Sequence, residues 1–381
     1  MNAKAPFFKL EATSNKARAG VLTTSHSRIE TPVFMPVGTR GTVKSMTMQD
    51  MEELGAEIIL GNTYHLYLRP GMELMHKMGG LHQFSTWKKS ILTDSGGYQV
   101  FSLSKLNKII EEGVHFKSHI DGSSHFFTPE LSMSVQKSLG SDIVMCFDEC
   151  PALPATRETL EKSMKLTLRW SKRCRDFKLQ DHQHLFGIIQ GGLELDLRKE
   201  CFRELDAMGP FAGYALGGLS VGEKNEKMVE LLHDFVDGTM PVHLPRYLMG
   251  VGKPLDILNA VREGVDLFDC VIPTRNARNG GVFTIDGPLN IKNVRFKEDS
   301  LPLDPDCHCK VCKRYSRSYI RHLFLVGEYT AGQLLCFHNL HFYLQMMRNI
   351  RKSILDNQFE QFYQSFKMRY LSNLWQGISD S

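Results

Sequence analysis

The stretch Val265-Asp266-Leu267-Phe268-Asp269-Cys270 is a short apolar segment that ends at a carboxylate, and it is the last of eight short apolar segments along the chain. Such segments, separated by sequence with helical patterning, are typical of strand-helix units. The segments that we predict to be strands are Pro32 to Pro36, Ala56 to Leu60, Ser90 to Thr93, Asp142 to Phe147, Leu185 to Ile189, Gly213 to Leu216, Tyr247 to Met249 and Val265 to Phe268.

The number and spacing of these segments separate two α/β architectures. Eight strand-helix units in about 250 residues is the size of a (β/α)8 TIM barrel. A doubly wound open sheet is the alternative, but the glycine fingerprint that it would need after the first strand is missing. We therefore predict an α/β protein with a (β/α)8 barrel.

Helical patterning is strongest in three spans between the predicted strands. These are Met48 to Leu54 after the cap-like Ser45, Thr128 to Leu139, and Thr156 to Cys174. A further helix-like stretch runs from about Asn339 to Met368. Residues 6 to 30 show strand alternation around a turn region at Lys16 to Gly20, which predicts a β-hairpin that caps the barrel.

Composition excludes several classes of protein. The 381 residues are 42% hydrophobic and 23% charged, which is ordinary for a soluble globular chain. Neither an apolar run long enough for a membrane span nor a signal sequence at Met1 to Lys9 is visible, so we expect a cytoplasmic protein with no membrane partner. Of its nine cysteines, three are clustered and six are dispersed, which is not the pattern of a disulfide framework. The net charge of +4 is too weak by itself to indicate nucleic-acid binding.

A cysteine cluster near the C-terminus predicts a metal site. Cys307, Cys309 and Cys312 lie within six residues, and His338 follows at a plausible return distance. Three thiolates and one imidazole complete a tetrahedron around Zn²⁺ with no open position, so we predict one structural zinc per subunit. Cys336 and His341 are rivals of His338 for the fourth position.

The catalytic residues are expected at the C-terminal ends of the barrel strands, where the loops of such barrels converge. Asp94, Asp148 and Asp269 follow the third, fourth and eighth predicted strands, and glycine pairs follow the fifth and sixth. Paired histidines for a hydrolytic metal and a strand-end lysine for a Schiff base are both missing. Carboxylates are the usual nucleophiles and acid/base groups at glycosidic carbons, which indicates glycosidic chemistry.

Five long motifs, together with the zinc cluster and His338, closely resemble those of bacterial tRNA-guanine transglycosylases. The resemblance covers residues 7 to 370. The motifs are Thr93-Asp94-Ser95-Gly96-Gly97-Tyr98-Gln99, Phe147-Asp148-Glu149-Cys150, Gly217-Gly218-Leu219-Ser220-Val221-Gly222-Glu223, Arg246-Tyr247-Leu248-Met249-Gly250-Val251-Gly252-Lys253-Pro254, and the run from Asp266 to Gly280.

The resemblance implies an irregular barrel with an inserted zinc subdomain, and a specific reaction. The wobble guanine of tRNAs with GUN anticodons (Asp, Asn, His, Tyr) would be exchanged for 7-aminomethyl-7-deazaguanine (preQ1) in queuosine biosynthesis. Asp269 would be the nucleophile that forms a covalent intermediate with tRNA, and Asp94 would accept and donate the proton. Such a double displacement needs no consumed cofactor.

Other matched positions imply how the base and the RNA are held. Asp148 would accept the N1–H and N2–H₂ donors of guanine, and Gln190 and the Gly218 N–H would donate to its O6. Tyr98 and Met249 would sandwich the ring, while Cys150 and Val221 would wall off the larger queuine and the Leu219 carbonyl would receive the aminomethyl group. The remaining matched positions are Gly217 at the base and, for RNA binding, Lys253, Arg275 and Arg278.

The resemblance also implies a homodimer. Lys44 and Glu328 match an intersubunit ion pair, and Tyr315, Tyr319 and His322 match an aromatic interface cluster. The predicted division of the chain is a cap at 1–30, a barrel at 31–280, a zinc subdomain at 281–340 and a closing C-terminal helix at 341–381. Alternatives to the preQ1 enzyme are a transglycosylase that accepts queuine and a non-catalytic RNA-binding subunit, although the presence of both Asp94 and Asp269 argues against the latter.

Overall fold

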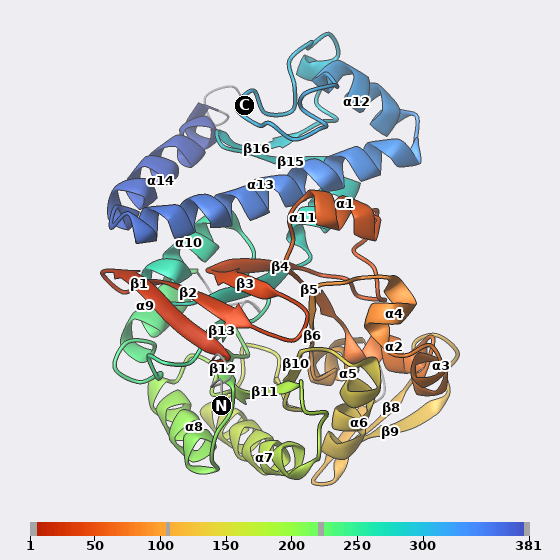
Figure 1. The fold of residues 1–381 in the computed structure, drawn as a ribbon, viewed down its shortest axis with the longest axis vertical. Helices are drawn as coiled ribbons and strands as arrows, with labels where there is room; N and C mark the ends of the chain where they lie inside the picture. Colours follow the sequence, from red (N-terminus) through yellow and green to blue (C-terminus); the bar gives the residue numbers. More distant parts are fainter. Residues whose placement is uncertain (1–5, 104–106, 220–224, 377–381) are drawn as a thin grey trace, which may run out of the picture.

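The computed structural model describes residues 6–103, 107–219 and 225–376, and its centre is a parallel sheet of eight strands (Figure 1). A parallel bridge between Val37 and Leu60 brings the two edge strands together, so the sheet is a nearly closed barrel. The predicted α/β barrel is confirmed. In order around the barrel, which is also chain order, the strands are β4 (Val33–Pro36), β5 (Ile58–Gly61), β6 (Ser90–Thr93), β10 (Ile143–Met145), β11 (His184–Ile189), β12 (Gly213–Leu216), β13 (Arg246–Leu248) and β14 (Leu267–Cys270).

The last strand begins and ends two residues later than predicted. Its pairing with β4 continues through Asp269 opposite Met35 and Cys270 opposite Pro36. Asp269 therefore lies inside a paired strand, where the backbone on both sides is fixed. The barrel interior is filled by buried strand side chains such as Leu92 and Met145, as expected for a packed core.

Helices surround the barrel (Figure 1). They are α1 (Met48–Glu53), α2 (Thr63–Leu68), α3 (Met72–Lys77), α4 (Leu81–Ser85), α5 (Gly97–Leu103), α6 (Pro129–Leu139), α7 (Arg157–Asp176), α8 (Leu195–Ala207), α9 (Asn225–Phe235), α10 (Pro254–Arg262), α11 (Ile272–Arg278), α12 (Arg317–Leu325), α13 (Tyr329–Leu355) and α14 (Phe359–Gln376). None of the helices in the described parts of the chain has both the length and the apolarity of a bilayer crossing.

Two of the three predicted helices begin where expected, and the cap predicted for the other is wrong. Thr128 and Thr156 accept hydrogen bonds from the first turns of α6 and α7. The cap of α1 is Thr47 and not Ser45, because Thr47 forms a reciprocal capping box with Asp50. Ser45 has a φ of 64° and lies in the preceding turn.

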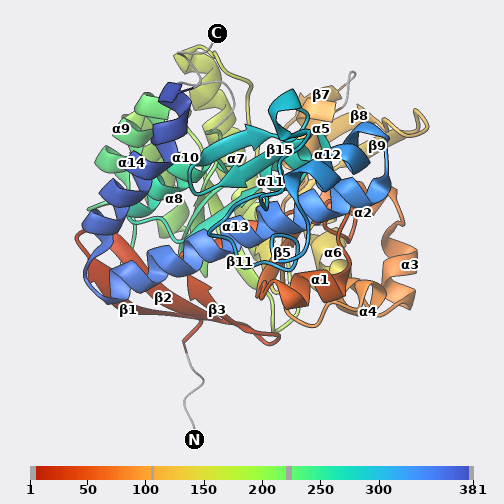
Figure 2. The same ribbon diagram turned by 90° about the horizontal axis from the view of Figure 1, so that it is seen from above.

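The N-terminal residues form a three-stranded antiparallel sheet and not the predicted hairpin. Its strands are β1 (Phe8–Ser14), β2 (Ala17–Thr23) and β3 (Arg28–Thr31). The first turn falls at Asn15, which has a φ of 52°, so most of the predicted turn region is strand. The sheet lies across the end of the barrel at which the strands begin (Figure 2), with Phe7 stacked on His184 at the start of β11.

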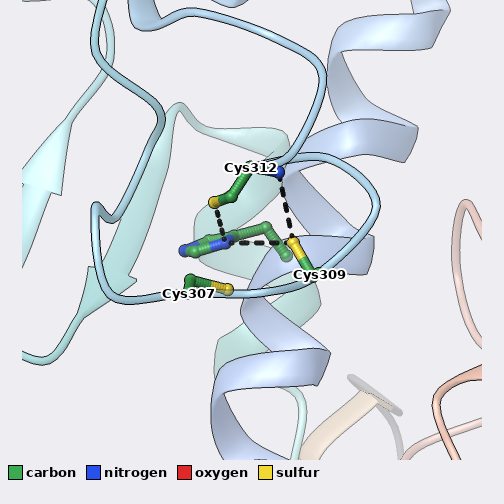
Figure 3. Close-up of side chains that lie close together, drawn as sticks. Cys307, Cys309 and Cys312 are labelled. Carbon is green, nitrogen blue, oxygen red and sulfur yellow. Dashed lines mark hydrogen bonds between the residues drawn. The ribbon is translucent and has the colours of Figure 1, made fainter.

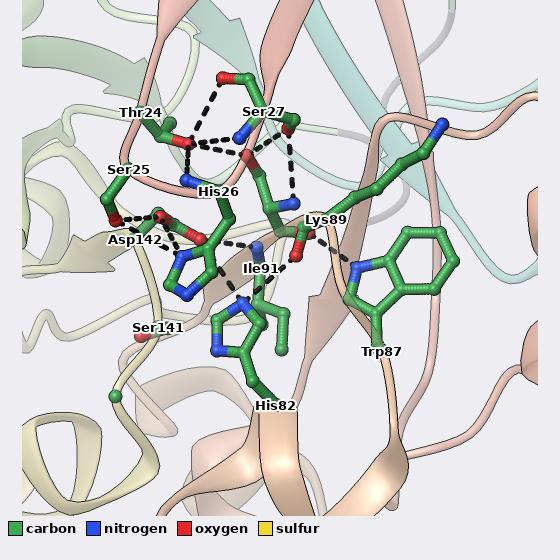
Figure 4. Close-up of polar contacts among 12 residues, drawn as sticks. Thr24, Ser25, His26, Ser27, His82, Trp87, Lys89, Ile91, Ser141 and Asp142 are labelled. Carbon is green, nitrogen blue, oxygen red and sulfur yellow. Dashed lines mark hydrogen bonds and ion pairs between the residues drawn. The ribbon is translucent and has the colours of Figure 1, made fainter.

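A buried carboxylate ties the turn between β2 and β3 to the barrel (Figure 4). Asp142, just before β10, accepts hydrogen bonds from His26 Nδ1 at 2.7 Å and from the Ile91 N–H at 2.9 Å. The ring of His26 stacks on His82 at 3.8 Å between centroids. Burial by itself would raise the pKa of Asp142, but the hydrogen bonds from His82, His26 and Ile91 outweigh it and lower that pKa to about 2.

The C-terminal region contains two helices where one helix-like stretch was predicted. The break falls at residues 356–358, where Asn357 has a φ of 53°. The long helix α13 crosses the barrel and packs against α11 and β4 (Figure 1). Between β14 and α13 the chain forms the hairpin β15 (Gly281–Thr284) and β16 (Gly287–Asn290), the 3-10 turn η1 (Val294–Phe296), the cysteine cluster and α12.

A second antiparallel sheet follows β6, consisting of β7 (Asn107–Ile110), β8 (Gly113–Lys117) and β9 (Ser124–Phe127). Figure 2 places it at the other end of the barrel from β1, β2 and β3. The two ends of the barrel therefore differ. The sheet of β1, β2 and β3 covers the end at which the strands begin, and the sheet of β7, β8 and β9 borders the other end.

Candidate active site and metal centre

A cavity of about 450 Å³ opens at the C-terminal ends of the barrel strands. This volume is within the usual range for a small-ligand site, roughly 300–1,000 Å³. The structure brings ten of the predicted site residues together in its lining. They are Asp94, Tyr98, Asp148, Cys150, Gly217, Gly218, Leu219, Met249, Asp269 and Arg275.

Asp269 is held in the cavity by two donors on the neighbouring strand. The Tyr247 hydroxyl donates to its Oδ1 at 2.6 Å, and the Gly250 N–H donates to the same oxygen at 2.8 Å. Neither of these two donors hydrogen-bonds to Oδ2. Burial raises the pKa of Asp269, and the two hydrogen bonds oppose that rise. One carboxylate oxygen is thus fixed by two donors, while the other has no hydrogen bond to either of them.

Asp94 lies at the end of β6 and is held by the residues that follow β5. Its Oδ2 accepts from Asn62 Nδ2, and its Oδ1 accepts from the Thr63 N–H at 2.8 Å. Burial raises the pKa of Asp94 to about 7, and the nearby charge of Asp269 adds to the rise. A carboxyl group with this pKa can both give and take a proton near neutral pH.

Asp148 follows β10 and is held by two side chains from different strands. Ser95 Oγ donates to its Oδ1 at 2.9 Å, and Gln190 Nε2 donates to its Oδ2 at 2.8 Å. Burial raises the pKa of this carboxyl group, against the hydrogen bonds from Gln190 and Ser95. A carboxylate has about four lone-pair sites, so it can accept two further donors from a ligand.

Glycine is required at two positions beside Gln190. A Cβ added to Gly217 would lie 2.6 Å from Gln190 Nε2, and one added to Gly218 would lie 2.6 Å from its Oε1. Gly218 also has a φ of +64°, which side-chain-bearing residues rarely adopt. The glycine pair allows the backbone to approach the base-sized cavity closely.

Part of the rim and wall of the cavity is apolar. Tyr98 is 51% exposed at the rim, Met249 is partly exposed, and Leu219 is buried. Burial raises the pKa of Cys150 to about 12, so its thiol stays neutral and forms part of the wall. The predicted specificity residue Val221, together with Ser220, lies outside the described residues.

Cationic side chains gather beside the cavity. Arg275 lies on α11 in the lining, whereas Lys253 caps α10 and Arg278 is outside the lining. Burial lowers the pKa of Lys44, and the charges of Arg278, Arg40 and Arg275 lower it further. Lys44 and the three arginines, Arg40, Arg275 and Arg278, therefore lie near one another.

The cysteine cluster converges on one imidazole, as predicted (Figure 3). Ligand atoms of Cys307, Cys309, Cys312 and His338 all lie within 4.8 Å of one another. His338 Nδ1 is 3.3 Å from Cys312 Sγ and 3.7 Å from Cys309 Sγ. Three soft thiolates and an imidazole at this separation fit a tetrahedral zinc ion.

The surroundings of the cluster favour His338 over its rivals as the fourth ligand. Its Nε2 lies 2.9 Å from the Phe283 carbonyl, which fixes the ring with Nδ1 toward the sulfurs. Cys336 points elsewhere, because its thiol donates to the Thr274 carbonyl. His341 Nδ1 contacts Cys307 alone among the three sulfurs, at 3.5 Å.

Tyr319 and His322, two of the residues predicted to form a dimer interface, lie on α12, and Tyr315 lies just before it. Tyr315 and Tyr319 stack at 5.5 Å between ring centroids, and Tyr319 is 45% exposed. Lys44 is also exposed. The homodimer stays a prediction.

Several residues that hold the carboxylates had no role assigned from the sequence, although Ser95 and Tyr247 lie within the matched motifs. Asn62 and Thr63 hold Asp94, Tyr247 holds Asp269, and Ser95 holds Asp148. The segment Gly61-Asn62-Thr63 follows a predicted strand, so the strand-end rule that identified the carboxylates could have found it. Tyr247 lies within a strand and gave no such signal.

Comparisons with known proteins agree with this site. A family model described as queuine tRNA-ribosyltransferase matches residues 13–372. Proteins named queuine tRNA-ribosyltransferase are similar in Fusobacterium nucleatum (55% identity, covering 95% of this chain and 98% of the relative) and Caldanaerobacter subterraneus (54%, covering 94% and 95%). Another, from Acinetobacter baylyi, is 53% identical and covers 95% of this chain and 94% of its own. The chain, with its carboxylate-lined barrel mouth and its cysteine-histidine cluster, therefore belongs to the queuine tRNA-ribosyltransferase family.

Proposed function

We propose that this protein is a tRNA-guanine transglycosylase that replaces the wobble guanine of GUN-anticodon tRNAs with preQ1 through a covalent intermediate. The observation that carries the proposal is the pair of carboxyl groups in one cavity. Asp269 has one oxygen fixed by Tyr247 and Gly250, and Asp94 has a pKa of about 7. This division of roles is the one that a retaining double displacement requires.

In the first half of the reaction, the free oxygen of Asp269 attacks the anomeric carbon of the ribose. The bond from that carbon to the glycosidic nitrogen of guanine breaks, and protonated Asp94 gives its proton to the departing base. The hydrogen bonds of Tyr247 and Gly250 to Oδ1 hold the carboxylate in line for attack.

The second half reverses these steps with a different base. Ionised Asp94 takes the proton from the glycosidic nitrogen of the incoming base, which then attacks the anomeric carbon. The bond to Asp269 breaks, and the new glycosidic bond replaces the old one, so no cofactor is consumed.

The base would be read by its hydrogen-bonding edge. Asp148 accepts the adjacent N1–H and N2–H₂ donors of guanine, with Ser95 and Gln190 keeping it in place. The second proton of the Gln190 amide and the Gly218 N–H are the donors for O6. Tyr98 and Met249 cover the faces of the ring, and Lys253, Arg275 and Arg278 contact the RNA beyond it.

Zinc is proposed to be structural. It would be held by Cys307, Cys309, Cys312 and His338, and none of these residues lines the cavity. The ion would link the cysteine loop to α13 and would leave no position open for a substrate or water.

The substrate proposal is tested by base exchange. Radiolabelled guanine is incubated with the protein and unmodified tRNA-Tyr, and the label that enters tRNA is measured. Incorporation that preQ1 blocks and queuine does not would support the preQ1 enzyme, and Val221→Gly would then be expected to admit queuine. Equal inhibition by both bases would instead identify a queuine-accepting transglycosylase, and no incorporation would favour a non-catalytic RNA-binding subunit.

A further inference from the structure

The sheet of β7, β8 and β9 is rigidly attached to the wall of the cavity. Tyr64 and Tyr67 on α2 hydrogen-bond to His119 at 2.9 Å and to His125 at 3.0 Å. His65, between the two tyrosines, lines the cavity. A ligand in contact with this sheet is therefore held in a fixed position relative to the catalytic carboxylates.

The other end of the sheet is fixed to α7. Trp170 Nε1 donates to the Glu111 carbonyl at 2.7 Å, and Arg173 donates to the carbonyls of Glu111 and Glu112 at 3.1 and 3.0 Å. Glu111 and Glu112 form the turn between β7 and β8. The sheet has attachments at both ends and can act as a platform.

The face of this sheet that points away from the barrel carries an exposed row of cationic and aromatic side chains. Strand pairing sets Lys108 opposite His115, and His115 opposite Phe126. Lys117 lies two residues after His115 and so points to the same face. All four residues are exposed, and Phe126 is 38% exposed.

The aromatic pair on this face is already arranged as a stack. The rings of His115 and Phe126 lie 4.2 Å apart between centroids with an interplanar angle of 20°. Phe126 is on β9, an edge strand of the three-stranded sheet, so within the sheet no further strand lies beside it. A planar group can extend the stack on that side.

The charge of the face selects the kind of partner. Its described outward positions, on the strands themselves, carry two lysines and no carboxylate. Aromatic rings flanked by cations on an antiparallel sheet are a common surface for unpaired RNA bases, because the rings stack on bases and the cations attract phosphates.

We propose that the outward face of β7, β8 and β9 is a binding surface for the anticodon arm of the tRNA substrate. An unpaired base stacks on Phe126, and backbone phosphates face Lys108 and Lys117. The inference rests on the proposed function, because a cavity of about 450 Å³ takes one base and leaves the rest of the loop on the rim.

The test compares Phe126→Ala with Phe126→Tyr in the full-length protein. Removing the ring should raise the KM for unmodified tRNA-Tyr roughly tenfold, which is within the effect of losing one stacked base, and should leave the KM for guanine unchanged. Tyrosine keeps the ring and should behave like the parent. Val242→Ala, which alters an exposed apolar side chain in the loop before β13, is the matched control.

A salt titration tests the two lysines separately. In filter binding of tRNA-Tyr, Lys108→Gln and Lys117→Gln should each lower the slope of log affinity against log salt by about one unit or slightly less. An unchanged slope together with an unchanged tRNA KM in Phe126→Ala would overturn the inference.

Two other outcomes would also overturn it. If Phe126→Ala changes the oligomeric state with unaltered tRNA affinity, the face is a protein contact. If it raises the KM for guanine as much as that for tRNA, the damage is to the cavity. Filter binding does not depend on turnover, so a failure of base exchange in the parent would refute the proposed function without deciding this inference.

Discussion

Asp94 and Asp269 have the same side chain, but their surroundings give them different chemistry. Asp94 is enclosed, and its pKa of about 7 leaves a large fraction protonated at neutral pH. Burial raises the pKa of Asp269 as well, but two donors on one of its oxygens oppose that rise. Because the two groups lie close enough to interact, their titrations are coupled, and a pH profile reports the pair.

The role of Asp269 can be tested by trapping. Asp269→Asn should abolish base exchange and the covalent tRNA adduct on a denaturing gel, because an amide cannot attack the anomeric carbon. Asn keeps the size of the side chain, so tRNA affinity should stay within a few-fold of the parent. A substantial covalent band from the variant would contradict the assignment.

Asp94 gives a prediction that separates activity from stability. Its folded pKa, about 7, lies above the unfolded value of about 3.9, so the buried carboxylate costs stability that grows as pH rises from about 4 to about 7. Asp94→Asn should therefore abolish exchange and yet be more stable than the parent at pH 8, by on the order of 1–3 kcal/mol. Urea unfolding at pH 8 and pH 4.5 measures this, and a variant less stable at pH 8 would show that the hydrogen bond from Asn62 matters more than burial.

At the scale of elements, single side chains fix the two ends of the barrel in different ways. Asp142 ties the β2–β3 turn to β6 and β10 at the end where the strands begin. Asn62 and Tyr247 orient carboxylates at the end where they finish. We expect the first arrangement to stabilise the fold and the second to support the proposed reaction, which is the division of labour usual in barrels.

Because the hydrogen bonds of Asp142 tie the β2–β3 turn to the barrel, we expect their removal to lower stability without loss of base exchange. Its folded pKa of about 2 lies below the unfolded value, so its contribution is complete above about pH 4 and is lost as pH falls toward 2. At pH 7, Asp142→Asn should destabilise the protein by roughly 2 kcal/mol, with exchange activity retained. The control is Asp181→Asn, at an exposed aspartate before β11. Equal unfolding midpoints for the two variants would refute a stabilising role of Asp142.

The metal centre can be tested by its ligands. Cys309→Ala and His338→Ala should each lower zinc content from one per chain toward none and lower the melting temperature, because the proposed ion would link the cysteine loop to α13. His341→Ala should retain the metal. Full zinc in His338→Ala and loss in His341→Ala, measured by elemental analysis of purified protein, would reverse the assignment.

At the scale of the whole molecule, the exposed face of α12 predicts self-association. Tyr319 is 45% exposed and stacked on Tyr315, which is the kind of aromatic anchor that dominates interfaces. Tyr319→Ala should weaken a homodimer by about 2 kcal/mol or more, seen as dissociation on dilution in sedimentation experiments. Met368→Ala, at an exposed methionine on α14, is the control, and an unchanged dimer in Tyr319→Ala would place the interface elsewhere.

Much of the architecture could be predicted because it depends on local patterns. The spacing of apolar segments indicated the barrel, and strand-end positions identified Asp94, Asp148 and Asp269. Errors arose where a local pattern was compatible with two structures. The continuous helical patterning from Asn339 to Met368 did not reveal the break at residues 356–358, and the alternation in residues 6–30 did not reveal a third strand.

The sequence by itself determined which chemical groups this protein has: carboxylates after parallel strands, and three thiols with an imidazole. Only the tertiary structure decided which partners those groups have. Asn62 reaches Asp94 because β5 and β6 are neighbours. His338 is favoured over His341 as the metal ligand because the Phe283 carbonyl, on a hairpin far away in the sequence, fixes its ring. The physical reason is that short-range periodicity specifies strands and helices, whereas hydrogen-bond partners and pKa values depend on residues brought together from far apart in the chain.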